Sequence, residues 1–203
     1  MPLIDLIRHG ETETPGLLLG RTDSALSPLG WQQFARQTEG GNWPLVVSSP
    51  LARARAAAET LAGTQGLSLR VDEDWAELDF GAFDGRHPGE LRKDVETAAA
   101  LDALYRREDA VPPGGESWAS LRARVERALS RIADEADDTD ADRAAALVVT
   151  HGGPIRAAVA VTCNIPFAHL WTLRIGYGTR LKLRFGQDES GAFWGEIIEI
   201  GQP

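Results

Sequence analysis

The stretch Leu6-Ile7-Arg8-His9-Gly10-Glu11-Thr12 decides the fold of this 203-residue chain. It ends an apolar run that begins at Leu3, and buried parallel strands have few polar residues, so residues 3–8 are predicted to form a strand. A second apolar run, 144–150, ends in the same way, at Thr150-His151-Gly152-Gly153. Two strands that each end in His-Gly indicate one site built from both strand ends.

Helical and extended patterns alternate along the rest of the chain, which predicts an α/β layered fold with a mainly parallel sheet. The predicted helices are 28–38, 51–63, 91–107, 117 to about 135, and 154–163. The other predicted strands are 45–47, 67–71, 180–185 and 193–200. We expect one domain over 1–203, with a small helical insertion at about 84–117. In such sheets ligands bind beyond the carboxyl ends of the strands, which is where His9 and His151 lie.

The composition excludes several classes of protein. Lys and Arg number 21 and Asp and Glu 30, so the net charge of −9 argues against nucleic acid or a membrane surface as partner. The 43% hydrophobic content supports a real core. Cys163 is the only cysteine, which excludes an intrachain disulfide. Because the sequence shows neither a signal-peptide pattern nor an apolar run near 18 residues, we expect a cytoplasmic protein.

Metal binding is not expected from the sequence. The pattern Asp138-x-Asp140-x-Asp142 imitates the start of a calcium-binding loop, but Arg143 and Val149 stand where that loop needs Gly and Glu. We interpret this acidic segment as a solvated helix end and loop. His87 and His169 lack ligand spacing with the other histidines, so we predict no metal and no cofactor.

The strand-end residues have the chemistry needed to grip and attack a phosphate. A neutral imidazole such as that of His9 can attack phosphorus and hold the phosphoryl group covalently. Gly10 lets a substrate approach closely. The guanidinium forks of Arg8 and Arg53 suit phosphate oxygens, and Arg53 lies at a helix start, where backbone N–H groups attract anions.

Two further roles are assigned from the same pattern. Doubly protonated His151 can donate to a phosphoryl oxygen, and Gly152 can add a backbone N–H. The leaving oxygen needs a proton, for which Glu77 is our candidate acid. The residues alone do not separate Glu77 from its acidic neighbours Glu73, Asp74, Asp79 and Asp84.

These residues resemble the histidine phosphatase superfamily, also called phosphoglycerate-mutase-like, over nearly the whole chain. The matching segments begin with 8–12, which places His9 at the phosphohistidine position. They continue with 20–23, 26–30, 48–54 with Arg53, 77–85 with Glu77, 115–117 and 149–153. The resemblance implies a three-layer sandwich and substrate contacts from Gly10, Thr12, Gly20, Arg21 and Gly152. Pro15 stands where the family often has a phosphate-binding Asn, so Thr12, Thr14 or a loop N–H would have to substitute.

The resemblance implies a phosphomonoesterase that acts through a phosphohistidine on a small phosphorylated metabolite. The string Glu-Leu-Asp-Phe-Gly at 77–81 and the short chain resemble α-ribazole-5′-phosphate phosphatases, and a sugar phosphate is the other expected substrate. Leaving-group specificity is expected on residues 11–22 and 78–118. The alternatives are a cofactor-dependent phosphoglycerate mutase and a non-catalytic phosphate-binding module. A monomer and a homodimer are both compatible with the sequence.

Overall fold

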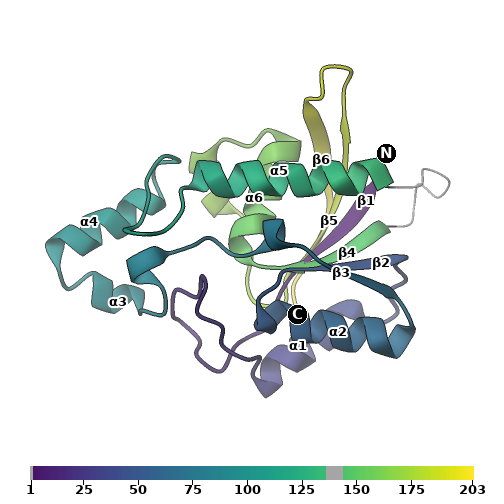
Figure 1. Ribbon diagram of the computed structural model, residues 1–203, viewed down its shortest axis with the longest axis horizontal. Helices are drawn as coiled ribbons and strands as arrows, with labels where there is room; N and C mark the ends of the chain where they lie inside the picture. Colours follow the sequence, from purple (N-terminus) through teal and green to yellow (C-terminus); the bar gives the residue numbers. More distant parts are fainter. Residues whose placement is uncertain (1, 136–143) are drawn as a thin grey trace.

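A computed structural model describes residues 2–135 and 144–203, and its centre is a six-stranded sheet (Figure 1). The strand order is β3-β2-β4-β1-β5-β6. The bounds are β1 Leu3–Arg8, β2 Leu45–Ser48, β3 Ser68–Val71, β4 Ala144–Thr150, β5 Arg180–Gln187 and β6 Phe193–Gly201. The first four strands in this order are parallel, and β5 and β6 are antiparallel at one edge. The predicted mainly parallel sheet is therefore confirmed.

Helices cover both faces of the sheet, which gives the predicted three layers (Figure 1). Helices α1 (Pro28–Thr38) and α2 (Ala52–Gln65) cover one face, and α5 (Trp118–Glu135) and α6 (Gly152–Cys163) cover the other. Alternate residues of a strand point to opposite faces, and so Ile7 packs with the first helix pair while Leu6 packs with the second. The apolar run of β1 thus contributes side chains to the core on each face of the sheet.

The segment between the third strand and α5 differs from the prediction. A single helix over 91–107 was expected, but the structure has two, α3 (Pro88–Leu91) and α4 (Val95–Leu104). The Asp94 side chain accepts a hydrogen bond from the Thr97 N–H at 2.9 Å, so it caps a new helix instead of continuing the first. Short 3-10 turns, η1 (Glu73–Trp75) and η2 (Gly81–Phe83), precede this pair, and η3 (Phe167–Thr172) follows α6.

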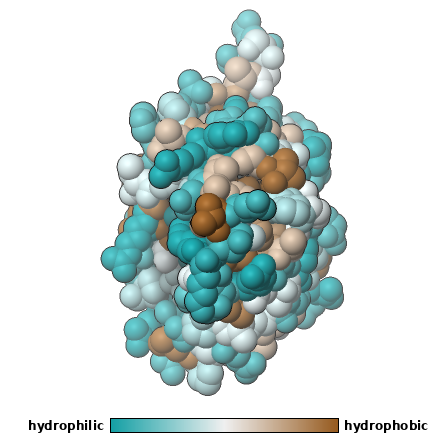
Figure 2. All heavy atoms as spheres, turned by 90° about the vertical axis from the view of Figure 1, so that its left-hand side faces the viewer, coloured by the Kyte–Doolittle hydropathy of each residue, from teal (hydrophilic) through white to brown (hydrophobic). Residues whose placement is uncertain are grey.

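The α3–α4 segment has a small apolar core of its own, which includes Phe83, Leu91 and Leu101. Figure 2 shows the side of the molecule on which these helices lie, and apolar residues there are scattered among hydrophilic ones. No helix within 2–135 or 144–203 is long and apolar enough to cross a membrane. The acidic segment at 138–142 lies outside the described residues, so its interpretation stays a prediction.

Candidate active site

The parallel pairing of β1 with β4 brings the two predicted histidines together. Arg8 lies opposite Thr150 in the register, so His9 and His151 leave the sheet at the same edge. The His9 N–H donates to the Thr150 carbonyl at 2.9 Å, and the two imidazole centroids are 5.0 Å apart. Both rings are almost completely buried. Two strand ends far apart in the sequence therefore form one site.

The hydrogen bond of His9 determines which ring nitrogen is free. Its Nδ1 lies 2.7 Å from the Gly10 carbonyl oxygen, which can only accept, so Nδ1 must hold the proton. Burial, followed by the charges of Arg8 and Arg53, lowers the pKa of His9 well below its ordinary value. The ring is then neutral at physiological pH, and Nε2 keeps an unprotonated lone pair.

His151 is held by a residue that the sequence analysis did not assign. Its Nε2 lies 2.7 Å from the Ser49 hydroxyl, and its Nδ1 is buried without a hydrogen-bond partner. Burial, and after it the charge of Arg53, lowers the pKa of His151 well below its ordinary value. The predicted doubly protonated form is therefore disfavoured in the ligand-free site. A bound phosphate dianion acts in the opposite direction, because a neighbouring anion favours the charged imidazolium.

Arg53 is fixed by the backbone of the preceding loop. Its side chain is fully buried, and its guanidinium donates to the carbonyl oxygens of Leu19, Gly20 and Thr22 at 2.6 to 2.9 Å. The Asp23 side chain accepts a hydrogen bond from the Ala52 N–H, which ties this loop to the start of α2. These bonds hold the positive charge near both histidines, and Arg53 Nη1 forms an ion pair with Asp23 Oδ1 at 3.6 Å.

Arg8 is oriented by the segment that precedes β5. Its Nη1 donates to the Ile175 carbonyl at 2.8 Å, and its Cζ lies 4.2 Å from the centroid of the Tyr177 ring. The Tyr177 ring is also 5.6 Å from His9. The Arg8 Nε is buried without a partner. Tyr177 was not a candidate from the sequence, because Gly176-Tyr177-Gly178 matches no motif considered there.

Of the five candidate acids, Glu77 alone lines the cavity that also contains Arg8. Its Oε1 accepts hydrogen bonds from the N–H groups of Leu78 at 2.9 Å and Gly153 at 3.1 Å. The others are occupied elsewhere or exposed: Asp74 pairs with Arg127 and Arg131, Asp79 with Arg21, Asp84 accepts from 20–22, and Glu73 faces solvent. The geometry therefore separates residues that the sequence left equivalent.

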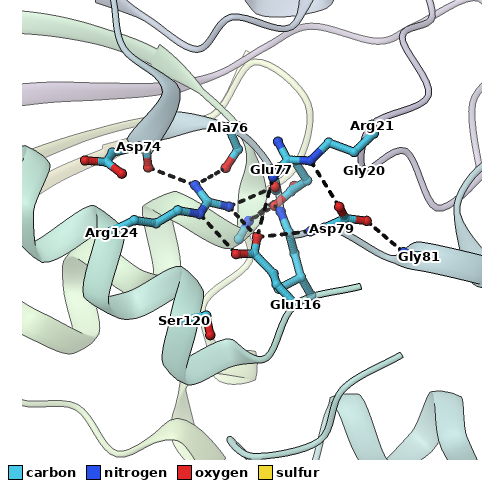
Figure 3. A network of polar contacts seen from close by, with 12 residues as sticks. Gly20, Arg21, Asp74, Ala76, Glu77, Asp79, Gly81, Glu116, Ser120 and Arg124 are labelled. Atoms are coloured by element: carbon cyan, nitrogen blue, oxygen red, sulfur yellow. Dashed lines mark hydrogen bonds and ion pairs between the residues drawn. The ribbon is translucent and has the colours of Figure 1, made fainter. Parts of the chain in front are cut away.

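The backbone of Glu77 is held by a buried arginine of α5 (Figure 3). The Arg124 guanidinium donates to the carbonyls of Asp74, Ala76 and Glu77 at 2.6 to 2.9 Å. It also pairs with both carboxylate oxygens of Glu116, the nearer at 2.6 Å. Glu116 in turn accepts from the Asp79 N–H. Arg124 and Glu116 thus hold the backbone before and after Glu77 in the sequence.

The predicted substrate-binding residues have different surroundings. Gly152 is buried in the cavity wall, while the Thr12 hydroxyl is buried without a partner. A Cβ on Gly10 would come within 2.0 Å of the Gly30 carbonyl, so packing of α1 against the strand end already requires this glycine. Gly20 packs in the same way against Leu78. Arg21 is exposed and its Nε pairs with Asp79 at 3.4 Å, so its guanidinium lies outside the cavity lining.

The cavity beside Arg8 and Glu77 has a volume of about 140 Å³. Five of its lining residues come from the predicted specificity segment 78–118: Leu78, Phe80, Leu104, Tyr105 and Trp118. Arg156 of α6 and Trp171 of η3 were not predicted. Within the described chain, residues 11–22 contribute nothing to this lining. A tryptophan in an apolar pattern is usually a core residue, so the sequence held no signal for Trp171.

A family model described as the histidine phosphatase superfamily (branch 1) matches residues 4–192. The chain belongs to the histidine phosphatase superfamily. The adenosylcobalamin/alpha-ribazole phosphatase of Salmonella typhimurium is 30% identical over 179 residues, which cover 85% of each chain. The solved structure of mycobacterial glucosyl-3-phosphoglycerate phosphatase is 27% identical, covers 97% of both chains and superposes with a TM-score of 0.83. The predicted family and phosphoglycerate-mutase-like fold are thus confirmed, and these relatives agree with the predicted enzyme class.

A bifunctional protein of Mycobacterium tuberculosis is 33% identical over 177 residues. The match covers 84% of this chain and 46% of that protein, so the chain spans about half the length of this relative.

Proposed function

We propose that this protein is a phosphomonoesterase that cleaves small phosphorylated metabolites through a phosphohistidine at His9. One observation supports the proposal most strongly. The Nε2 of a neutral, buried imidazole is left unprotonated by the Nδ1 contact to Gly10, beside the charges of Arg8 and the fully buried Arg53. A nucleophile poised in a cationic site is what attack on a phosphate dianion requires.

In the first step His9 Nε2 donates its electron pair to phosphorus, and the bond from phosphorus to the ester oxygen breaks. The Glu77 carboxyl gives its proton to the departing oxygen, so the alcohol leaves neutral. Arg8 and Arg53 hold the phosphoryl oxygens, and His151 donates to one of them once the bound anion has favoured its protonation. The products are the free alcohol and phosphohistidine.

In the second step water attacks the phosphohistidine. The Glu77 carboxylate accepts the proton of this water, the bond from phosphorus to nitrogen breaks, and inorganic phosphate leaves. His9 and the Glu77 carboxyl return to their starting forms. The peptide of Glu77 is fixed by Arg124, which suits a carboxyl that must serve both as acid and as base at one position.

The substrate class rests on the relatives and on the size of the cavity. Relatives named for α-ribazole phosphate and glucosyl-3-phosphoglycerate support a small phosphorylated metabolite. A cavity of about 140 Å³ next to Glu77 suits an alcohol of modest size. This proposal includes α-ribazole-5′-phosphate and sugar phosphates and does not choose between them. Cytoplasmic location and a monomeric or homodimeric state remain predictions from the sequence.

The test is phosphate release from 4-nitrophenyl phosphate by the wild type, by His9→Ala and by His169→Ala. We expect turnover by the wild type and by the exposed-site control His169→Ala, with a loss of about 10⁴-fold or more in His9→Ala. Undiminished turnover in His9→Ala would refute the proposal.

Incubation with 3-phosphoglycerate and a trace of 2,3-bisphosphoglycerate tests the mutase alternative. Formation of 2-phosphoglycerate without matching free phosphate would favour the mutase.

A further inference from the structure

The cavity contains a second guanidinium besides that of Arg8. Arg156 lies one helical turn after Gly152 on α6, and Gly152 separates the two arginines. A Cβ at Gly152 would lie 3.1 Å from Arg156 Nη1 and 3.9 Å from Arg8 Cζ. Both arginines and Glu77 line the same cavity. Two cations therefore face a space that has a single carboxylate.

Neither arginine is neutralised by a direct contact in the described chain. Arg156 donates to the carbonyls of Gly152 and Leu173, both at 3.1 Å, and the hydrogen bond described for Arg8 goes to a carbonyl as well. The Nε of each is buried without a partner. Carbonyls fix the plane of a guanidinium but leave its full charge available to an anion.

The two arginines serve different ends of the cavity. The Arg8 guanidinium lies over the Tyr177 ring, which is itself 5.6 Å from the ring of the predicted nucleophile His9. The Arg156 guanidinium instead lies beside Trp171, which packs against Tyr105 on the wall formed by the predicted specificity segment. Arg156 thus lies on the side from which the alcohol leaves.

Aromatic rings form the wall around Arg156. Its Cζ is 5.1 Å from the centroid of Trp171, and Trp171 meets Tyr105 edge to face at 4.9 Å. Trp118 completes the group, 6.2 Å from Trp171. These rings come from η3, from the residue that follows α4 and from α5. An apolar body in the cavity can pack against this aromatic wall, and contact with Trp171 helps to orient the guanidinium.

We propose that Arg156 binds a carboxylate on the alcohol portion of the substrate, so that the preferred substrates are phosphomonoesters of hydroxy acids. This inference rests on the proposed phosphatase function. A carboxylate matches the planar fork of a single guanidinium. A second phosphate dianion fits less well, because one cation serves this end and Glu77 contributes negative charge beside it. Arg156 is a specificity-determining residue that takes no part in bond breaking.

The test uses isosteric substrate pairs that differ in charge alone. The probes are 3- and 4-carboxyphenyl phosphate, each compared with the carbamoylphenyl phosphate of the same substitution. We expect the wild type to prefer the carboxylated member of at least one pair by about 10- to 100-fold in kcat/KM. Arg156→Gln should reduce that preference to about 1, and the ratio within each pair cancels any loss of kcat/KM that both members share. Arg156→Lys should keep part of the preference, mainly through KM.

Arg174→Gln is the matched control, because Arg174 is exposed on the segment that accepts hydrogen bonds from both cavity arginines. It should keep the wild-type preference. A wild-type ratio near 1 for both pairs overturns the inference and leaves the proposed function intact. An unchanged ratio in Arg156→Gln does the same. Failure of the wild type to hydrolyse any of the four probes overturns the proposed function and this inference together.

Discussion

The two ends of the candidate active site are built in different ways. At the phosphate end, His9, His151 and Arg53 are at most 3% exposed, and two of the three hydrogen-bond to backbone carbonyls. At the leaving-group end, the Tyr105 and Trp171 rings are each 37% exposed and pack against one another. Backbone anchoring suits the step that every phosphate ester shares, whereas a wall of side chains can differ between relatives without disturbing that step.

The largest effect should come from disturbing the phosphate end at Arg53. Arg53→Lys keeps the charge but loses the fork that reaches three carbonyls, so the cation can no longer hold both the loop and the phosphate. We expect kcat/KM to fall by about 10²- to 10³-fold on every phosphate ester. Arg55→Lys is the control, since Arg55 is exposed and paired with Glu59 on the same helix. A loss confined to some leaving groups would contradict the division between the two ends.

Glu77 lies between the two ends, and its effect should depend on the leaving group. Glu77→Gln keeps an acceptor for the Leu78 and Gly153 N–H groups but cannot give up a proton. We expect kcat/KM on alkyl phosphates to fall by about 10²-fold or more. The rate of the 4-nitrophenol burst from 4-nitrophenyl phosphate should fall much less, because 4-nitrophenolate leaves without a proton. Glu73→Gln, at an exposed position, should match the wild type. Equal losses on both substrates would exclude Glu77 as the acid.

Arg124 is expected to act through Glu77. Arg124→Lys retains a charge opposite Glu116 but cannot reach all three carbonyls that fix the Glu77 segment. We expect about a tenfold lower kcat/KM on alkyl phosphates and a smaller loss of kcat/KM on 4-nitrophenyl phosphate, because kcat/KM reports the first step and a misplaced acid matters most where the leaving group needs a proton. Arg127→Lys, on the exposed side of the same helix, is the control. The same loss on both substrates would mean that Arg124 has only a structural role.

The smallest expected effect is on the free energy of unfolding. This effect should arise at the phosphate end, because that end contains both buried histidines. The folded-state pKa values of His9 and His151 are lowered, so the unfolded chain binds more protons below about pH 6.5. The free energy of unfolding should therefore fall by about 1 kcal/mol for each histidine between pH 6.5 and 5.5. Urea unfolding of the wild type and of the His9→Asn/His151→Asn variant measures this difference. The same fall in both proteins would contradict the lowered pKa values.

The sequence predicted the phosphate end because its signals are local. The apolar runs of β1 and β4 end directly in His-Gly, and Ser27 stands directly before α1, where its Oγ accepts from the Gly30 N–H at 3.1 Å and caps the helix. The leaving-group end depends on packing between distant segments. Arg156 reads as an ordinary helical arginine and Trp171 as a core residue until α6 and η3 meet. The helical pattern of residues 91–107 continues past Asp94. The sequence therefore did not reveal that Asp94 caps a second helix there.

The proposed mechanism requires that His9 becomes phosphorylated during turnover. The most direct measurement is rapid quenching of Glu77→Gln with 4-nitrophenyl phosphate, followed by peptide mass spectrometry under alkaline conditions. In this variant the first step needs no proton for the leaving group, but water lacks its base in the second, so the intermediate should accumulate. We expect one phosphoryl group on the imidazole of His9, together with a stoichiometric burst of 4-nitrophenol. A burst with the phosphoryl group on any other residue, or turnover with none on the protein, would contradict it.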